Sequence, residues 1–366
     1  MTDLEALVTI NAARALTLES YRGLAARLGS PAAILRASRK QLAETGLLSR
    51  AVADRIQKTA REFDATKEIE RATRYGIRLT PYDDASYPAN LKTIPNPPLL
   101  LYMKGDVVEA DRIAVALVGS RRCSHYGRTH AERLALELAS GGVCIVSGLA
   151  YGIDAAAHRG ALKAGGRTIA VQGCGLGRVY PAHHKDLATE ITKHGAVLSE
   201  LPLDAPPAAQ NFPARNRLIS GLCLGVVVVE AAKRSGSLIT ATWAAEQGRE
   251  VFALPGALDS PVSQGTNALI RDGAKLVQSA REIIAGLGPL AESIVLPDGR
   301  TLDDMRGASL AGDEGRVFSF LGPNPASIDE IAQGAGLGAA AANSALLALE
   351  IKGLAQRLAG NRFARL

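Results

Sequence analysis

Glycine, hydroxyl and basic side chains gather in short turns that follow apolar stretches of this sequence. Two such turns are Gly119–Arg122 (GSRR) and Lys233–Ser237 (KRSGS), and Ser147–Asp154 and Gly265–Asn267 are similar. Glycine lets the backbone approach an anion closely, and a helix N-terminus offers free N–H groups. A guanidinium matches the geometry of a phosphate. The turns therefore predict a cradle for phosphate groups.

A second candidate is the six-residue segment Phe212–Arg217 (FPARNR), which holds an aromatic ring, two guanidiniums and an amide. It has two readings. In one it is the solvated start of a helix, with Phe212 filling a core position. In the other it contacts phosphate groups and stacks on a base. Composition alone favours neither.

The motifs of several enzyme classes are missing. The glycines of Gly173–Gly177 do not fit GxGxxG, and neither a Walker A motif nor a GxSxG elbow occurs. The six histidines lack metal-ligand spacing. Asp154 follows a glycine turn, and capping of a helix is favoured over acid–base chemistry. The sequence therefore predicts binding rather than turnover, with no cofactor and no metal.

The turns alternate with apolar runs and helical stretches, which fixes where the candidate residues meet. The predicted strands are Ile113–Val118, Val143–Val146, Thr168–Val171, Ala196–Leu198, Val226–Val229 and Val251–Leu254. Continuous apolar strands separated by helices indicate a parallel sheet that is covered on both faces. The predicted fold class is α/β, with a doubly wound sheet. In such sheets ligands bind at the carboxyl ends of the strands, where these turns lie.

Four regions follow from the pattern along the chain. Residues 1–75 read as short helices, with Gly46 at a junction as in helix–hairpin–helix units, and an interaction domain is favoured over a DNA-contacting hairpin. Residues 76–290 hold the Rossmann-like sheet, and prolines near their start indicate an extended connection. Residues 291–312 read as a linker. Residues 313–366 read as three helices and a hairpin, the order of a winged helix.

Charge is distributed unevenly over these regions. The 366 residues carry a net charge of +6 and only 4% aromatic residues, which argues against a sheet that stacks bases on many rings. Residues 1–75 have a net charge of +4, residues 113–277 of +5 and residues 291–366 of −2. The positive excess lies in residues 1–75 and in residues 113–277, which hold the phosphate-type turns, and this favours an anionic partner.

These motifs, in this order, resemble those of the DprA/Smf family of DNA-processing proteins. The resemblance rests on Gly119–Arg121, Ser147–Asp154 with His158, Phe212–Arg217, Ser235–Ala241 and Glu246–Arg249, followed by Gly265–Asn267. It implies a SAM-like helical domain, an extended Rossmann domain and a winged helix. It also implies a cytoplasmic homodimer that protects incoming single-stranded DNA in natural transformation and loads RecA recombinase onto it.

The turns and the resemblance together give one candidate site for single-stranded DNA. Its residues are Gly119, Ser120, Arg121, Ser147, Gly148, Phe212, Arg215, Asn216, Arg217, Lys233, Ser235, Gly236, Ser237 and Asn267. The family often has a basic residue shortly before the phenylalanine, and Ala208–Asn211 has none. The expected recognition helix, Ala339–Glu350, also lacks Lys and Arg. We therefore expect the winged helix to contact protein rather than to read DNA sequence.

A nucleotide-processing enzyme of the phosphoribohydrolase type is the alternative. Its PGGxGTxxE motif is split here, and Leu269 stands where the glutamate belongs. The first ten residues lack the basic start of a signal peptide, and the longest uncharged run, Ile331–Leu349, is not a membrane span. The four cysteines have no CxxC spacing, so buried free thiols in a reducing cytoplasm are expected.

Overall fold

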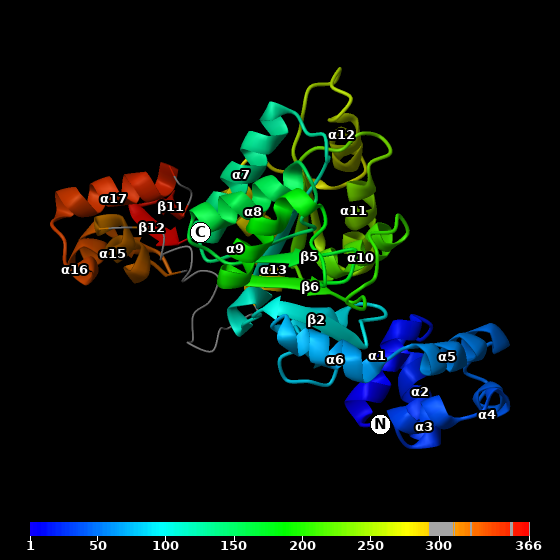
Figure 1. The fold of residues 1–366 in the computed structure, drawn as a ribbon. Helices are drawn as coiled ribbons and strands as arrows, with labels where there is room; N and C mark the ends of the chain where they lie inside the picture. Colours follow the sequence, from blue (N-terminus) through cyan, green and yellow to red (C-terminus); the bar gives the residue numbers. More distant parts are fainter. Residues whose placement is uncertain (293–309, 311, 323, 352–353, 366) are drawn as a thin grey trace. The chain divides into compact units, whose positions relative to one another are not determined.

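The computed structural model describes residues 1–292, 310, 312–322, 324–351 and 354–365. The chain divides into two compact units, Met1–Gly288 and Pro289–Leu366 (Figure 1). Each unit has its own buried apolar cluster.

A nine-stranded sheet forms the centre of the first unit. Its strands are β1 (Ile77–Pro81), β2 (Leu100–Gly105), β3 (Ala114–Val118), β4 (Cys144–Ser147), β5 (Thr168–Val171), β6 (Gly195–Ser199), β7 (Gly225–Val228), β8 (Glu250–Ala253) and β9 (Lys275–Leu276). They lie in the order β1-β2-β6-β5-β4-β3-β7-β8-β9. The strands from β6 to β9 in this order pair in parallel, as the sequence predicts for β3 to β8, whereas β9 was not predicted. Every residue of β3 to β7 is buried.

The parallel sheet is extended at one edge by an antiparallel pair. β1 pairs with β2, and β2 pairs with β6, in both cases antiparallel. Sequence reasoning placed an extended connection and a strand in this region and missed β1. The prolines between the two strands fit the observed loop, because they interrupt helix without preventing a later strand.

Helices cover both faces of this sheet. They are α7 (His125–Ser140), α8 (Ile153–Lys163), α9 (Lys185–His194), α10 (Asn211–Gly221), α11 (Gly236–Glu246), α12 (Gln264–Arg271) and α13 (Ala280–Glu292). α8 packs on β4 and β5 and between α7 and α9, whereas α11 packs on β7 and β8 and beside α10. Alternation of strand and helix brings the turns after β3, β4, β5, β6 and β7 to one edge of the sheet.

Six helices precede the sheet in the same unit. They are α1 (Asp3–Ala13), α2 (Leu18–Leu28), α3 (Pro31–Arg36), α4 (Arg39–Glu44), α5 (Arg50–Glu62) and α6 (Ala65–Arg74). Hydroxyl side chains cap several of them, as Thr17 does for α2 and Ser30 for α3. α1 packs on α3, α5 and α6, and the apolar cluster of these helices reaches Tyr102 of β2. The predicted boundary at residue 75 falls between α6 and β1.

The second unit is small and mostly helical. Its elements are α15 (Asp313–Phe320), β10 (Ala326–Ser327), α16 (Ile328–Ala335), α17 (Ala339–Ile351), β11 (Ala355–Leu358) and β12 (Arg362–Arg365). The three strands form a sheet in the order β10-β12-β11. Ser327 caps α16 in a capping box with Glu330, as the sequence predicts. Most of the predicted linker, residues 291–312, lies outside the described residues.

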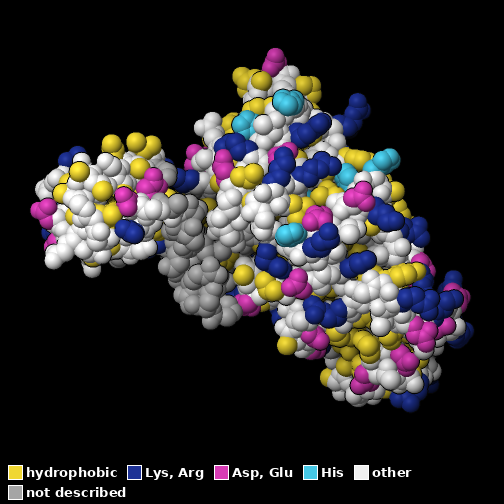
Figure 2. Space-filling view, turned by 60° about the vertical axis from the view of Figure 1, so that its left-hand side comes forward, with side chains coloured by type: hydrophobic (Ala, Val, Ile, Leu, Met, Phe, Trp, Pro, Cys, Tyr) yellow, Lys and Arg dark blue, Asp and Glu magenta, His cyan; other side chains and the backbone are white. Residues whose placement is uncertain are grey.

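The two units differ in their surface charge. On the face that Figure 2 shows, Lys and Arg side chains are frequent over the first unit and sparse over the second. Among the described helices, none is by itself long and apolar enough to span a membrane. α16 and α17 meet such a test only when taken together, and they are bent by 103° relative to each other.

Candidate functional site

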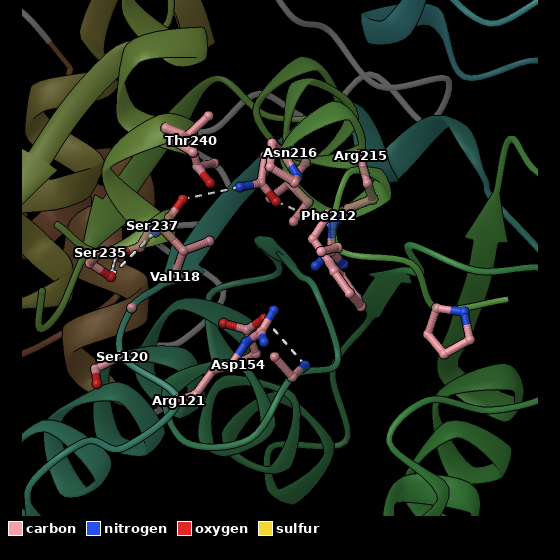
Figure 3. A pocket seen from close by; sticks show the side chains of 18 of the residues that line it. Val118, Ser120, Arg121, Asp154, Phe212, Arg215, Asn216, Ser235, Ser237 and Thr240 are labelled. Carbon is pink, nitrogen blue, oxygen red and sulfur yellow. Dashed lines mark hydrogen bonds between the residues drawn. The ribbon is translucent and has the colours of Figure 1, made fainter.

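A cavity of about 710 Å³ opens where the parallel strands end (Figure 3). Its lining comes from the turns after β3, β4, β5, β6 and β7 and from the first turns of α10 and α11. The predicted site residues in the lining are Gly119, Ser120, Arg121, Phe212, Arg215, Asn216, Ser235, Gly236 and Ser237. The predicted site residues outside it are Ser147, Gly148, Arg217, Lys233 and Asn267. Its volume lies in the range of small-ligand pockets.

The turn after β3 is fixed by its backbone. A Cβ on Gly119 would lie 2.7 Å from Cγ1 of Ile153 and 2.8 Å from the carbonyl oxygen of Glu230, so only glycine fits. The N–H of Ser120 donates to that Glu230 carbonyl at 2.8 Å, and the Ser120 hydroxyl accepts from the N–H of Arg122 at 3.1 Å. These contacts therefore fix the backbone of the turn, which sets the position of Arg121.

Arg121 is an exposed cation that lies against an aromatic ring. Its guanidinium carbon is 5.0 Å from the ring centroid of Phe212, within cation–π distance. Tyr180 lies beside the same ring, with centroids 5.6 Å apart and planes tilted by 39°. Arg121, Phe212 and Tyr180 come from three separate segments, and the cavity brings them together.

Arg215 lines the cavity, but its side chain is buried and its guanidinium is bonded to other parts of the protein. It donates to the carbonyl oxygen of Gly148 at 2.8 Å, to the carbonyl oxygen of Val171, and through Nε to Oδ1 of Asn216 at 3.3 Å. Burial lowers its pKa to about 10, and the charge of Asp154 opposes this. A Cβ on Gly148 would lie 2.5 Å from Nη1 of Arg215. Gly148 is therefore required by the arginine, and the arginine ties α10 to the ends of β4 and β5.

The prediction that Asp154 caps its helix is wrong. α8 begins at Ile153 after Gly152, so Asp154 lies inside the first turn. Its carboxylate accepts the backbone N–H groups of Gly148 at 3.1 Å and Ala150 at 3.3 Å. Burial raises its pKa, while the charge of Arg215 acts in the opposite direction. Asp154 thus holds the glycine turn after β4 in place.

The serine turn after β7 also lines the cavity. Ser235 caps α11 by accepting from the N–H of Ser237 at 3.4 Å, and the two hydroxyls are 2.8 Å apart. A Cβ on Gly236 would meet nothing within 4 Å, so the backbone here is open to a ligand. Nδ2 of Asn216 donates to the Gly236 carbonyl at 3.1 Å, which joins α10 to this turn.

The five predicted residues outside the lining have other surroundings. Ser147 is buried and donates to the carbonyl oxygen of Leu117 at 2.6 Å. Asn267 bonds the backbone of Gly256 through both ends of its amide, at 3.0 and 3.2 Å. Lys233 is exposed in the turn just before Ser235. These contacts give Ser147 and Asn267 roles in holding turns.

Arg217 lies on another side of α10. Its guanidinium pairs with Glu200, and both side chains are less than a fifth exposed. It lines a second cavity of about 260 Å³ together with Asn11 and Arg14 of the N-terminal helices. Arg14 in turn donates to Oδ1 of Asn211 at 2.9 Å. This side of α10 is therefore joined to α1.

Sequence reasoning missed Tyr180 and Thr240 in the lining of the large cavity. Tyr180 stands nine positions after the end of β5, in a loop without a motif, so no local spacing marks it. Thr240 lies one helical turn after Ser237 on α11, and helical periodicity could have identified it. No group of three His, Cys, Asp or Glu suitable for a metal occurs in the described parts of the chain.

Two family models match this chain. The family model described as "DNA recombination-mediator protein A" matches residues 78–288, and that of the DprA winged helix domain matches residues 303–361. Protein Smf of Escherichia coli is 49% identical over 210 residues, which are 57% of this chain and 56% of that protein. The chain thus matches about half the length of that relative.

Two solved structures share the fold. DNA processing protein A of Streptococcus pneumoniae has a TM-score of 0.66 and 36% identity, over 78% of this chain and 98% of that chain. DNA processing protein A of Helicobacter pylori, reported for its single-stranded DNA binding mode, has a TM-score of 0.52 and 34% identity, over 57% of this chain and 95% of that chain. On the family model, which spans more than half of the residues, the chain belongs to the DprA/Smf family of DNA-processing proteins.

Proposed function

We propose that this protein binds single-stranded DNA in the large cavity, protects incoming DNA in natural transformation and loads RecA recombinase onto it. One observation carries the binding step: the exposed guanidinium of Arg121 lies over Phe212 in a cavity that the open turn Ser235–Ser237 also lines. A phosphate can bind to the guanidinium and to the open backbone at Gly236, and a base can stack on the ring.

The geometry also favours binding over turnover. The one carboxylate in the lining, Asp154, is held by two backbone N–H groups, and Arg215 is held by two carbonyl oxygens. Neither group is placed to take up or deliver a proton to a ligand. The Helicobacter pylori relative, whose reported structure concerns single-stranded DNA binding, supports the same class of ligand.

Fluorescence anisotropy with single-stranded and duplex oligonucleotides across a salt series tests the proposal. We expect tighter binding of the single strand, and an affinity that falls with salt as counterions are released. Arg121→Ala should weaken binding by roughly tenfold and flatten the salt dependence, because a charge-assisted contact to phosphate is lost. Arg27→Ala, which removes an exposed arginine of α2, is the matched control. Equal affinity for both DNA forms, or no effect of Arg121→Ala, would contradict the site.

RecA loading and dimer formation extend the same proposal. A loader must leave part of the strand accessible, and a cavity at one edge of a sheet holds only a few nucleotides. We expect the protein to shorten the lag of RecA assembly on a strand that is already coated by a single-strand-binding protein. Analytical ultracentrifugation should show a homodimer. An unchanged lag of RecA assembly would contradict the proposed loading of RecA. Hydrolysis of nucleoside monophosphates by the protein would favour the alternative of a nucleotide-processing enzyme.

A further inference from the structure

The large cavity has two chemically different walls. Its polar wall carries Ser120, Arg121 and the serines of the turn after β7. We call the apolar lining residues Tyr180, Pro207, Ala209, Phe212 and Pro213 its apolar wall; further apolar lining residues are Val118, Ala150, Ile219 and Ile239. A phosphate group requires only the polar wall, since cations and N–H groups bind it. The apolar wall therefore needs a different part of the ligand to explain it.

Tyr180 is the largest exposed surface of that apolar wall. The residue is 41% exposed. Phe212 lies beside it at 5.6 Å and carries Arg121 at 5.0 Å, so the three side chains adjoin in the order Arg121, Phe212, Tyr180. A ring left open at a cavity offers an area on which a planar apolar group can stack.

The amide and the carboxylate in the lining of the cavity already have partners within the protein. The amide of Asn216 donates to the Gly236 carbonyl and accepts from Nε of Arg215. The carboxylate of Asp154 accepts two backbone N–H groups. A base in this cavity would therefore meet ring faces rather than free amide or carboxylate groups. Recognition through the face of a base does not depend on its identity.

From these contacts we infer that Tyr180 is a second base-stacking surface, which extends the one formed by Phe212 and holds a nucleobase whose phosphate lies at the polar wall. This inference rests on the proposed function, because it assigns a role within the same DNA site. It also accounts for a preference for single strands, since a base held inside a duplex cannot present its face to a ring.

The loop that carries Tyr180 is anchored at its base. Its N–H donates to Oε1 of Gln172 at 2.9 Å, and Nε2 of the same residue lies 3.4 Å from the carbonyl oxygen of Arg178. Gln172 is only 3% exposed and directly follows β5. The backbone of Tyr180 is thus anchored to the end of a core strand, which limits the loss of conformational freedom when a ligand binds to its ring.

The test compares a normal strand with one that lacks bases. Anisotropy of the full chain is measured with an oligothymidylate and with an abasic strand of the same length, for the wild type, Tyr180→Ala, Tyr180→Phe and Tyr75→Ala. Tyr75 is equally exposed, at 42%, but lies outside the cavity lining, so it controls for the loss of a surface ring. Tyr180→Ala should weaken binding of the oligothymidylate about tenfold and leave the abasic strand unaffected.

Two further readouts separate stacking from a general disturbance of the site. The salt slope should be the same in Tyr180→Ala and in the wild type, since no phosphate contact is lost. Tyr180→Phe should bind like the wild type, because the ring is retained. In the wild type, 2-aminopurine placed in the strand should lose fluorescence on binding as it stacks on the rings. This last measurement needs no variant and holds even if Tyr180→Ala fails to fold.

The possible failures are distinguishable. If the wild type binds no single strand, the proposed function falls and the stacking role falls with it. If the wild type binds but Tyr180→Ala is unchanged, or loses the abasic strand equally, only the stacking role is overturned. Unquenched 2-aminopurine in a bound strand would overturn it as well.

Discussion

The two sides of α10 hold arginines that are two positions apart and have different surroundings. On one side Arg215 is buried under the large cavity and bonded to the ends of β4 and β5. On the other side Arg217 pairs with Glu200 in a smaller cavity that faces α1. Neither arginine is an exposed contact for phosphate, whereas Arg121, from another turn, is exposed. The comparison teaches that a basic motif can serve a binding site by holding its walls together.

Removal of Arg215 should have the largest effect on the stability of the protein. Arg215→Met should lower the free energy of unfolding by about 3–5 kcal/mol, because carbonyl oxygens lose their donors and Asp154 loses a compensating charge. Urea denaturation measures this loss, and Arg27→Ala supplies the control for removal of an exposed arginine. An unchanged urea midpoint with weaker DNA binding would make Arg215 a ligand contact instead.

Acid should destabilise the packing of α8 on β5 through His158. Burial lowers the pKa of this histidine to about 3. The hydroxyl of Thr168 donates to the carbonyl oxygen of Ile145 at 2.7 Å, so it accepts from Nδ1 of His158, also at 2.7 Å. Nε2 is buried without a partner among the described residues. Protonation of the folded state would therefore place an unpaired N–H and a positive charge in the core.

The sign follows from the lowered pKa. Below pH 6.5 the unfolded chain binds a proton that the folded chain does not, so stability falls as the pH falls toward 3. Between pH 7 and pH 5 the loss should be about 2 kcal/mol. Urea denaturation at both pH values measures it, and His158→Gln should remove this part of the pH dependence. A pH-independent difference between wild type and variant would show that His158 does not titrate in this range.

Removal of Arg217 should have a smaller effect of a different kind. Arg217→Met leaves Glu200 without its partner, which should lower the free energy of unfolding by about 1–3 kcal/mol. Binding of single-stranded DNA by the folded variant should keep the wild-type salt slope, because Arg217 does not line the large cavity. A flatter slope, measured by anisotropy, would mean that the DNA also reaches the second cavity. The double variant with Glu200→Gln should recover part of the lost stability.

The smallest effect is expected from the second compact unit. α17 has no Lys or Arg and exposes Leu347 and Ile351, at 58% and 76%. A chain that ends at residue 309 should therefore bind single-stranded DNA within about twofold of the full chain, since few phosphate contacts are lost. Anisotropy of both chains measures this. A clear loss of salt dependence on truncation would show that the winged helix contacts DNA.

Much of the fold was predictable because its signals are local. The strands β3 to β8 lie within one residue of their predicted ranges, and the three helices and the hairpin predicted for residues 313–366 are present in the described parts of the second unit. Continuous apolar runs must be buried, and glycine turns mark where they end. The antiparallel pair at the sheet edge was harder to predict. β1 is short and partly exposed, and a proline-containing loop separates it from β2.

The candidate site was predicted in part, for the same reason. Gly119–Arg121 and Ser235–Ser237 are local turns at strand ends, and the structure brings both to one cavity. The sequence left two readings of Phe212–Arg217 open, and the structure shows that the segment is the start of the helix α10. Once it is helical, Phe212, Arg215 and Asn216 share a side and Arg217 does not, since a helix turns every 3.6 residues.

Apolar runs and glycine turns were enough to locate the strands and turns, because these signals depend on backbone preferences and packing of adjacent residues. The contacts between side chains of distant segments became visible only in the folded structure. Tyr180 lies beside Phe212 because the loop after β5 passes the start of α10, and Arg215 reaches Gly148 because β4 and β5 end side by side. Such contacts join residues that are distant in the chain, and only the packing of helices on the sheet brings them within reach.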